Sequence, residues 1–262
     1  MLACRAMFIL AAASGTTTTP LQAAVLGAVQ GLTELLPVSS SAHLYVVPTL
    51  LGWPYAGLAF DVALHGGTLL ALVVAFWNDW LTLLREAFSP EPAIAREARL
   101  LWAKLVVATI PAAVAGKLFG EALEFESRHL PLQAATLFAF GLALWLADRL
   151  RPPGSDTRSP SWGVALGMGF AQCLALVPGV SRSGITMTSG RMTGLSRVAA
   201  ARFSFLLATP ITFGAFVLKV PDLPRDLPAL TLAIGVVTSA VFGVLAIRLL
   251  LAMLRRTGFG VF

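Results

Sequence analysis

The sequence predicts an all-α integral membrane protein built on an inverted-topology repeat, and three observations carry this prediction. Hydrophobic residues make up 57% of the 262 residues, charged residues only 12%, and the mean hydropathy is +0.81. A soluble domain is about one quarter charged, so the composition argues against a soluble enzyme. The apolar residues gather in stretches near the ~20 residues that cross a bilayer as a helix. Two similar polar segments, residues 30–43 and 172–184, interrupt this pattern 142 positions apart.

Full membrane spans are expected where about 20 apolar residues run without interruption. Five stretches qualify, at about residues 62–81, 101–119, 131–148, 203–219 and 229–251. Two further apolar regions, 21–51 and 160–196, are interrupted at Pro37 and at Pro178. Each half is too short to cross the membrane, so each region predicts a re-entrant helix–loop–helix hairpin. Irregular backbone at that depth must be buried in protein or face water.

These elements divide the chain into an N-terminal tail (1–20), a first repeat (21–148) and a second repeat (160–262). The first repeat holds one hairpin and three spans, and the second holds one hairpin and two spans. The tail has the short apolar run of a signal peptide, but the polar residues after it favour an uncleaved, fraying end. The 142-residue offset also predicts a sixth span, missing here beyond residue 262. An asymmetric protein with five spans is the alternative.

Basic residues lie between the apolar stretches. The connections 85–104, 149–158 and 255–256 are rich in Arg and Lys, whereas 121–128 is acidic. The positive-inside rule places the first three in the cytoplasm, so the first hairpin enters from outside. Three spans then invert the second repeat, and the two polar loops can meet near the midplane. The net charge of +6 needs no nucleic-acid partner, and two cysteines are too few for a disulfide scaffold or zinc site.

The first polar loop carries candidates for proton transfer and metal binding. Gln30 and Glu34 are four residues apart and share one helix face. A carboxylate at membrane depth predicts function, with a surface position or a structural ion pair as the alternative. His43 follows one turn into the next half-helix and is a functional candidate beside Glu34. The serines between them, which can cap that helix or cradle an anion, are Ser39, Ser40 and Ser41.

The second loop, residues 178–184, predicts an oxyanion site. Arg182 stands between serines and glycines, and its guanidinium offers a planar fork of donors to phosphate oxygens. The alternative is a gating or packing arginine paired with Glu34. The residues expected to bind phosphate are Ser39, Ser41, Gly179, Ser181, Arg182, Ser183 and Gly184. In the span after the first loop, Asp61 can line the outer mouth, and we expect His65 to be a packing residue.

These segments resemble a known family. Gln30-Gly-Leu-Thr-Glu-Leu-Leu-Pro-Val-Ser-Ser-Ser-Ala-His43 is similar to the first signature of the bacterial undecaprenyl-diphosphate phosphatases of the BacA type. Pro178-Gly-Val-Ser-Arg-Ser-Gly184, with Phe203-Ser-Phe-Leu-Leu-Ala208 downstream, resembles the second, and Phe60-Asp-Val-Ala-Leu-His-Gly-Gly-Thr68 resembles another family segment. The similarity runs from about residue 20 to the end. The chain departs from the pattern at Gln30, where the motif has its first acidic position, and at Arg202, where the family often has Glu.

The resemblance implies hydrolysis of undecaprenyl diphosphate to undecaprenyl phosphate and phosphate, which recycles the lipid carrier of cell-wall synthesis. It places the acidic motif residue on Glu34 and the catalytic serine on Ser40. It places the histidine on His43 and the phosphate-binding arginine on Arg182. Ser40 would attack or position an attacking water, while His43 and Glu34 share proton transfer. Glu34, with Gln30, would hold a divalent cation, Mg²⁺ or Ca²⁺.

The expected setting is the bacterial plasma membrane, with the site open to the periplasmic side. The expected partners are a polyprenyl diphosphate substrate, membrane lipids and a second copy in a homodimer. The rival hypothesis is a transporter or flippase of a phosphorylated lipid, because inverted repeats with broken helices are also a transporter design. Release of phosphate distinguishes the two, since transport breaks no bond.

Overall fold

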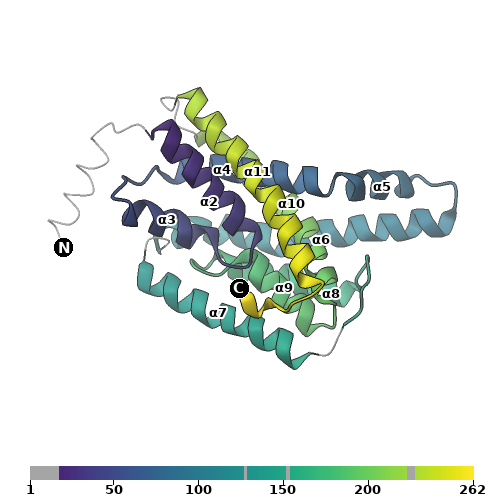
Figure 1. The fold of residues 1–262 in the computed structure, drawn as a ribbon. Helices are drawn as coiled ribbons and strands as arrows, with labels where there is room; N and C mark the ends of the chain where they lie inside the picture. The colour runs from purple at the N-terminus through teal and green to yellow at the C-terminus, as the bar shows by residue number, and fades with distance from the viewer. Residues whose placement is uncertain (1–17, 127–128, 152–153, 223–227) are drawn as a thin grey trace.

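The computed structural model describes residues 18–126, 129–151, 154–222 and 228–262, and within them the regular structure is helical (Figure 1). The expected N-terminal tail lies almost entirely outside these residues. The first half contains α2 (Pro20–Leu35), α3 (Ser40–Leu50), α4 (Leu58–Ala75), α5 (Trp77–Ala87), α6 (Pro92–Glu126) and α7 (Leu130–Leu150). The second half contains α8 (Trp162–Cys173), η1 (Leu174–Leu176), α9 (Arg182–Met192), α10 (Arg197–Lys219), η2 (Val220–Asp222), α11 (Ala229–Leu254) and η3 (Phe259–Val261).

Four of the described helices, α6, α7, α10 and α11, are long and apolar enough to cross a membrane. The bent pair α4–α5 is a fifth candidate. Large apolar side chains on these helices point outward, such as Phe138 on α7 and Val241 on α11. Water would not favour such a surface, but lipid does. The protein is therefore an all-α integral membrane protein, as the composition predicts.

The span expected at residues 62–81 is bent and consists of two helices. The helix breaks at Phe76, and the axes of α4 and α5 differ by 62°. The sequence turns polar just after the break, where Asp79 forms an ion pair with Arg202 of α10. The Arg202 guanidinium also lies over the Phe76 ring, 5.6 Å from its centroid. These contacts direct α5 toward α10 and away from the line of α4.

The connection expected at residues 85–104 is also largely helical, since only residues 88–91 separate α5 from α6. The short amphipathic helix α5 buries Leu83 and Ala87 in the same apolar cluster as Ala98 of α6. An apolar stripe on an otherwise polar segment is what keeps it folded as a helix. A window of 20 apolar residues cannot detect such a segment.

Both interrupted regions form the helix–loop–helix hairpins that the sequence predicts. Residues 36–39 separate α2 from α3, and residues 177–181 separate η1 from α9. Helices α3 and α9 each contain 11 residues, and α9 begins and ends 142 positions after α3. Helix α8 also begins 142 positions after α2. Pro37 and Pro178 lie in the loops, where a residue without an N–H interrupts helical hydrogen bonding.

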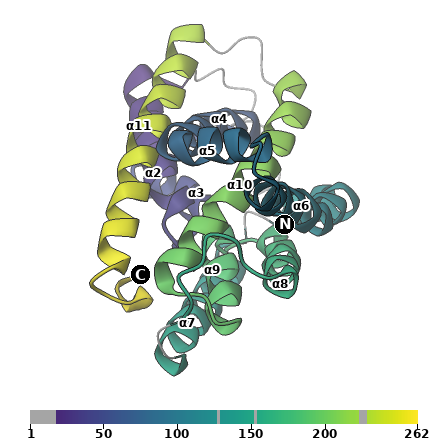
Figure 2. The same cartoon turned by 90° about the vertical axis from the view of Figure 1, so that its right-hand side faces the viewer.

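Helix α11 runs alongside α2 and also packs on α4 (Figures 1 and 2). Gly31 of α2 lies directly against backbone atoms of Ser239 and Gly243 in α11. Ser239 also donates a hydrogen bond from Oγ to the carbonyl of Leu64 in α4, at 2.8 Å. Helices in lipid associate through such close contacts because lipid tails are as apolar as the side chains. Helix α11 thereby fixes the positions of α2 and α4 relative to each other.

We predict opposite effects for two glycine substitutions. Gly31→Ala places a methyl group against α11 backbone, so it should lower stability by about 1–3 kcal/mol, the usual range for overpacking. Gly141→Ala on α7 meets open space and should leave stability unchanged or raise it by up to ~1 kcal/mol. Thermal unfolding of both variants in one detergent measures the difference. Equal shifts in Tm would contradict the role given to the α2–α11 contact.

Candidate active site

The tips of the two hairpins meet in the structure. Ser183 in the first turn of α9 donates a hydrogen bond from Oγ to the carbonyl of Leu36 in the first loop, at 3.0 Å. Pro37 of the first loop lies beside Gly184. Segments almost 150 positions apart therefore lie in contact, as the repeat predicts.

The carboxylate of Glu34 is the centre of this contact. Its side chain lies on the last turn of α2 and is only 9% exposed. Arg182 forms an ion pair with Oε1 through Nη2, and Ser40 donates a hydrogen bond from Oγ to Oε2. Gln30 donates from Nε2 to the same Oε2, at 3.3 Å. A carboxylate buried at this depth is costly unless donors satisfy it, and here both oxygens have partners.

Ser40 and Arg182 occupy equivalent positions of the two repeats. Ser40 is the first residue of α3, and Arg182, 142 positions later, is the first residue of α9. The N-termini of both half-helices thus converge on one carboxylate. Each helix N-terminus carries roughly half a positive charge and unpaired N–H groups, so this point favours anions. The carboxylate of Glu34 occupies a position that suits the oxygens of a phosphate.

The guanidinium of Arg182 is held from two sides. Nη2 pairs with Glu34, while Nη1 donates to Oγ1 of Thr212 at 2.7 Å and to the carbonyl of Ala208 at 3.3 Å, both in α10. The pairing with Glu34 was the alternative that the sequence left open for this arginine. The contacts from α10 fix the orientation of the guanidinium, which the loop sequence alone does not predict.

The serines of the two loops pair in the same way. Ser39 and Ser41 lie with their Oγ atoms 3.2 Å apart, and Ser181 and Ser183 lie 3.1 Å apart. Ser181 also caps α9 by accepting the N–H of Gly184 at 3.2 Å. Ser39 has a φ of +64°, the only non-glycine residue in the described ranges with a positive φ. Strain of this kind is concentrated at functional sites.

Several residues expected to bind phosphate also hold the second loop in place. Gly179 has a φ of +87° and packs on the backbone of Gln133 in α7. Thr136 of α7 donates a hydrogen bond to the carbonyl of Pro178, at 2.6 Å. Ser181 and Ser183 are buried and already hydrogen bonded, as described above. Among the second-loop candidates, Arg182 is therefore the one whose charge points into the centre.

The structure places His65, and not His43, beside Glu34. Nδ1 of His43 bonds to the carbonyl of Ser39 at 2.8 Å, so His43 braces the strained turn. Within the described residues, no contact joins His43 to Glu34. His65 was expected to be a packing residue, but its Nε2 lies 3.5 Å from Oε2 of Glu34. Its Nδ1 lies 2.7 Å from the carbonyl of Asp61. A carbonyl only accepts, so Nδ1 carries a hydrogen and Nε2 faces the carboxylate.

The donor set does not fit a divalent cation held by protein alone. The described residues contain no group of three or more His, Cys, Asp or Glu side chains suited to a metal. Glu34 already pairs with Arg182, and Gln30 turns its amide N–H toward that carboxylate. Mg²⁺ and Ca²⁺ require six or more oxygen ligands. Oε1 of Gln30, whose amide N–H donates to Glu34, is a buried oxygen without a partner among the described residues.

Known proteins are similar to this chain over most of its length. A family model described as bacitracin resistance protein BacA matches residues 23–262. The chain belongs to this family. Proteins named undecaprenyl-diphosphatase are similar over most of their length. The one from Pelotomaculum thermopropionicum is 46% identical over 245 residues, 93% of this chain and 91% of that protein. Those from Desulforudis audaxviator and Moorella thermoacetica are 48% and 47% identical over 243 and 244 residues, in both cases 93% of this chain and 92% of the relative.

The match to the BacA family covers both hairpins and every residue of the centre. It also covers two residues that sequence reasoning missed, His65 and Thr212. For His65 a signal was available, because a histidine four residues after Asp61 in an apolar span is unusual. For Thr212 the sequence offers no signal, since threonines occur freely in apolar helices and its contact with Arg182 is tertiary.

Proposed function

We propose that this protein hydrolyses undecaprenyl diphosphate to undecaprenyl phosphate and inorganic phosphate at the centre formed by Glu34, Ser40 and Arg182. One observation carries the proposal: the N-termini of two half-helices present a serine and an arginine to the same buried carboxylate. The centre therefore combines a nucleophile, a base and an anion-binding arginine. The relatives named undecaprenyl-diphosphatase support the choice of substrate.

In the first step the terminal phosphate binds between the loops. The guanidinium of Arg182 and the helix N-termini bind the phosphate oxygens. These donors either leave Glu34 or are shared between Glu34 and the phosphate. Thr212 keeps the guanidinium in place while this exchange occurs. The same donors then stabilise the charge that builds up on the phosphoryl oxygens in the transition state.

Ser40 is the nucleophile in this proposal. Its Oγ already donates to Oε2 of Glu34, so the carboxylate is placed to accept the proton. Oγ attacks the terminal phosphorus, the bond to the bridging oxygen breaks, and undecaprenyl phosphate leaves as an anion. Water then attacks the phosphorus of the seryl phosphate. Transfer of the phosphoryl group to water releases inorganic phosphate and restores the serine hydroxyl.

His65 takes the proton-transfer role that the sequence gave to His43. Its Nε2 faces Oε2 of Glu34, so a proton received from Ser40 can pass between the carboxylate and the imidazole. The contact of Nδ1 with the Asp61 carbonyl fixes the ring orientation. His43 instead supports the turn that presents Ser40.

The divalent cation stays a prediction. Glu34 and the buried Oε1 of Gln30 are the protein oxygens that would contact Mg²⁺ or Ca²⁺. Because these two cannot form a cage alone, a cation would need oxygens of the substrate diphosphate as well. When bound, the cation would neutralise phosphate charge. The proposed reaction does not require it.

The proposed setting is the bacterial plasma membrane with the site open to the periplasmic side. The support is the distribution of Arg and Lys, which favours cytoplasmic ends for α5–α6, for α7–α8 and for the C-terminus of α11. The C55 chain would lie against the exposed apolar faces of the helices. A homodimer also stays a prediction.

Purified protein in detergent should release inorganic phosphate from undecaprenyl diphosphate, and Arg182→Ala should lower kcat/KM by about 10²–10³-fold, the usual loss for one transition-state donor. Phosphate release with a colorimetric assay measures both. Transport without phosphate release would instead support the flippase hypothesis. Wild-type turnover in Arg182→Ala would contradict the role of the second loop.

Two neighbouring serines provide a matched test of the nucleophile. Ser40→Ala should lower kcat by about 10³-fold or more, as expected for a group that forms the covalent intermediate. Ser41→Ala removes an exposed hydroxyl that pairs only with Ser39 and should cost less than about tenfold. If Ser40→Ala loses less than tenfold, water attacks directly and Ser40 only positions it.

The two histidines provide a second matched test. His65→Ala should lower kcat by about 10²-fold, and His65→Gln, which keeps a donor but cannot transfer a proton, should not restore it. His43→Gln should change KM and thermal stability more than kcat, because within the described residues the hydrogen bond of His43 goes to the loop backbone. Steady-state kinetics with their pH profiles would measure this. Full rescue by His65→Gln would reduce His65 to a positioning residue.

A further inference from the structure

We infer that a second anion site, which binds a phosphate group, lies at the opposite end of α9 from Arg182. A cavity of about 310 Å³ opens there. It is lined by Arg151, Gly154, Asp156, Arg191, Ser196, Arg197, Val198, Leu254 and Arg255. Arg182 and Arg191 are nine residues apart on one helix, so the two sites are separated by about 14 Å along its axis. This inference does not depend on the proposed hydrolysis.

The cavity lies where membrane-spanning segments end. Arg151 directly follows α7, Arg255 directly follows α11, and Arg197 begins α10, and all three helices are candidate spans. Arginines from three separate helix ends therefore line one cavity at a boundary of the membrane. The apolar residues Val198 and Leu254 complete the lining. A site of this composition suits a charged group attached to, or close to, an apolar phase.

The local positive charge exceeds the local negative charge. Asp148, just behind the cavity, binds Nε of both Arg191 (3.2 Å) and Arg197 (2.7 Å), and its second oxygen accepts the N–H of Phe259 at 3.0 Å. Its oxygens are thus engaged by protein donors. Asp156 is the one acidic residue in the lining, against four arginines. Counting both aspartates leaves two positive charges without a matching carboxylate.

Two of these arginines are available to a ligand. Among the described residues, the side chains of Arg151 and Arg255 have no hydrogen-bond or ion-pair partner, and both are exposed. The buried side chain of Arg191 is fixed by Asp148 and by the carbonyls of Leu195 and Arg151. The cavity thus has a rigid cationic floor and two arginines at its rim that can close on an anion.

The wall of the cavity is held in place by backbone contacts. Ser155 donates its N–H to the carbonyl of Gly194 (2.9 Å) and accepts the N–H of Ser196 (2.8 Å). Gly154 lies against the carbonyls of the same turn, where a Cβ would not fit. Ser196 caps α10, so the positive end of a 23-residue helix also borders the cavity. The site is therefore built before any ligand arrives.

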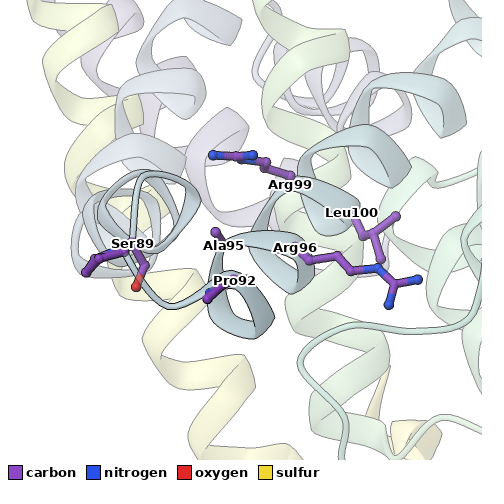
Figure 3. A pocket seen from close by; sticks show the side chains of 7 residues that line it. Ser89, Pro92, Ala95, Arg96, Arg99 and Leu100 are labelled. Carbon is purple, nitrogen blue, oxygen red and sulfur yellow. The ribbon is translucent and has the colours of Figure 1, made fainter.

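A second arginine-lined cavity shows that such convergence is not general. A hollow of about 400 Å³ between α5 and α6 is lined in part by Arg96 and Arg99. Their side chains point in different directions, and Nε of Arg99 donates to the carbonyl of Ala87 at 2.8 Å (Figure 3). These arginines are explained as anchors at the membrane boundary. At the end of α9, by contrast, Arg191 and Arg197 both bind the same carboxylate oxygen of Asp148.

The ligand class follows from the donors. Several guanidinium forks around one cavity match the oxygens of a phosphate monoester or diester. Such a group can come from an anionic lipid headgroup or from phosphate in solution. Binding of either should raise the thermal stability of the folded protein, by an amount that grows with the logarithm of its concentration over its Kd.

The test uses the full-length protein in a neutral detergent, with thermal unfolding followed by tryptophan fluorescence. Phosphatidylglycerol, phosphatidylcholine and inorganic phosphate are titrated separately. We expect phosphatidylglycerol to raise Tm and phosphatidylcholine not to do so. An equal increase with millimolar inorganic phosphate would identify solution phosphate as a source, whereas no increase would restrict the site to lipid headgroups.

The variants Arg151→Gln and Arg255→Gln should each weaken the apparent affinity for phosphatidylglycerol by about tenfold, since each removes one charge-assisted contact. Arg256→Gln is the matched control, because Arg256 is adjacent and exposed but does not line the cavity. Phosphate release by each variant confirms that the protein is folded. The inference is overturned if the three variants bind alike, or if phosphatidylcholine and phosphatidylglycerol give the same shift.

Discussion

The ion pair between Glu34 and Arg182 is the constraint on which the rest of the structure depends. Each of these charges alone at membrane depth would cost several kcal/mol, and each lies at the end of a half-helix beside one of the two loops. The two loops must therefore meet. Two further contacts hold the hairpins together. Ser183 donates a hydrogen bond to the Leu36 carbonyl, and Thr212 of α10 accepts one from Arg182.

The helix ends strengthen the same constraint. Glu34 lies in the last turn of α2, where the negative end of the helix dipole disfavours a carboxylate. The N-termini of α3 and α9 point at it and offset that effect. Helix α11 completes the arrangement by holding α2 against α4, which brings His65 to the second oxygen of Glu34. The small residues of the α2–α11 contact thus have a functional consequence, although none of them touches the centre.

The hairpins could be predicted from sequence because their causes are local. Proline and glycine interrupt two apolar stretches. The similar polar residues of the two loops are 142 positions apart, the same offset that separates the first residues of α3 and α9. The break at Phe76 could not be predicted, because it depends on Asp79 meeting Arg202, which is 123 positions away. The position of His65 rather than His43 beside Glu34 has the same origin. Sequence proximity placed His43 near Glu34, whereas the packing of α4 on α2 and α11 places His65 there.

Duplication explains how one carboxylate can serve two functions. Ser40 and Arg182 are the same position in two copies, and they approach Glu34 from opposite repeats. At that position the first copy supplies a hydroxyl that can lose a proton, and the second supplies a permanent charge. In the proposed mechanism, a phosphate that binds Arg182 competes with Glu34 for the same donors. The carboxylate then loses the partner that most stabilises its charge and becomes a stronger base toward Ser40. Substrate binding and activation of the nucleophile are thereby coupled through a single side chain.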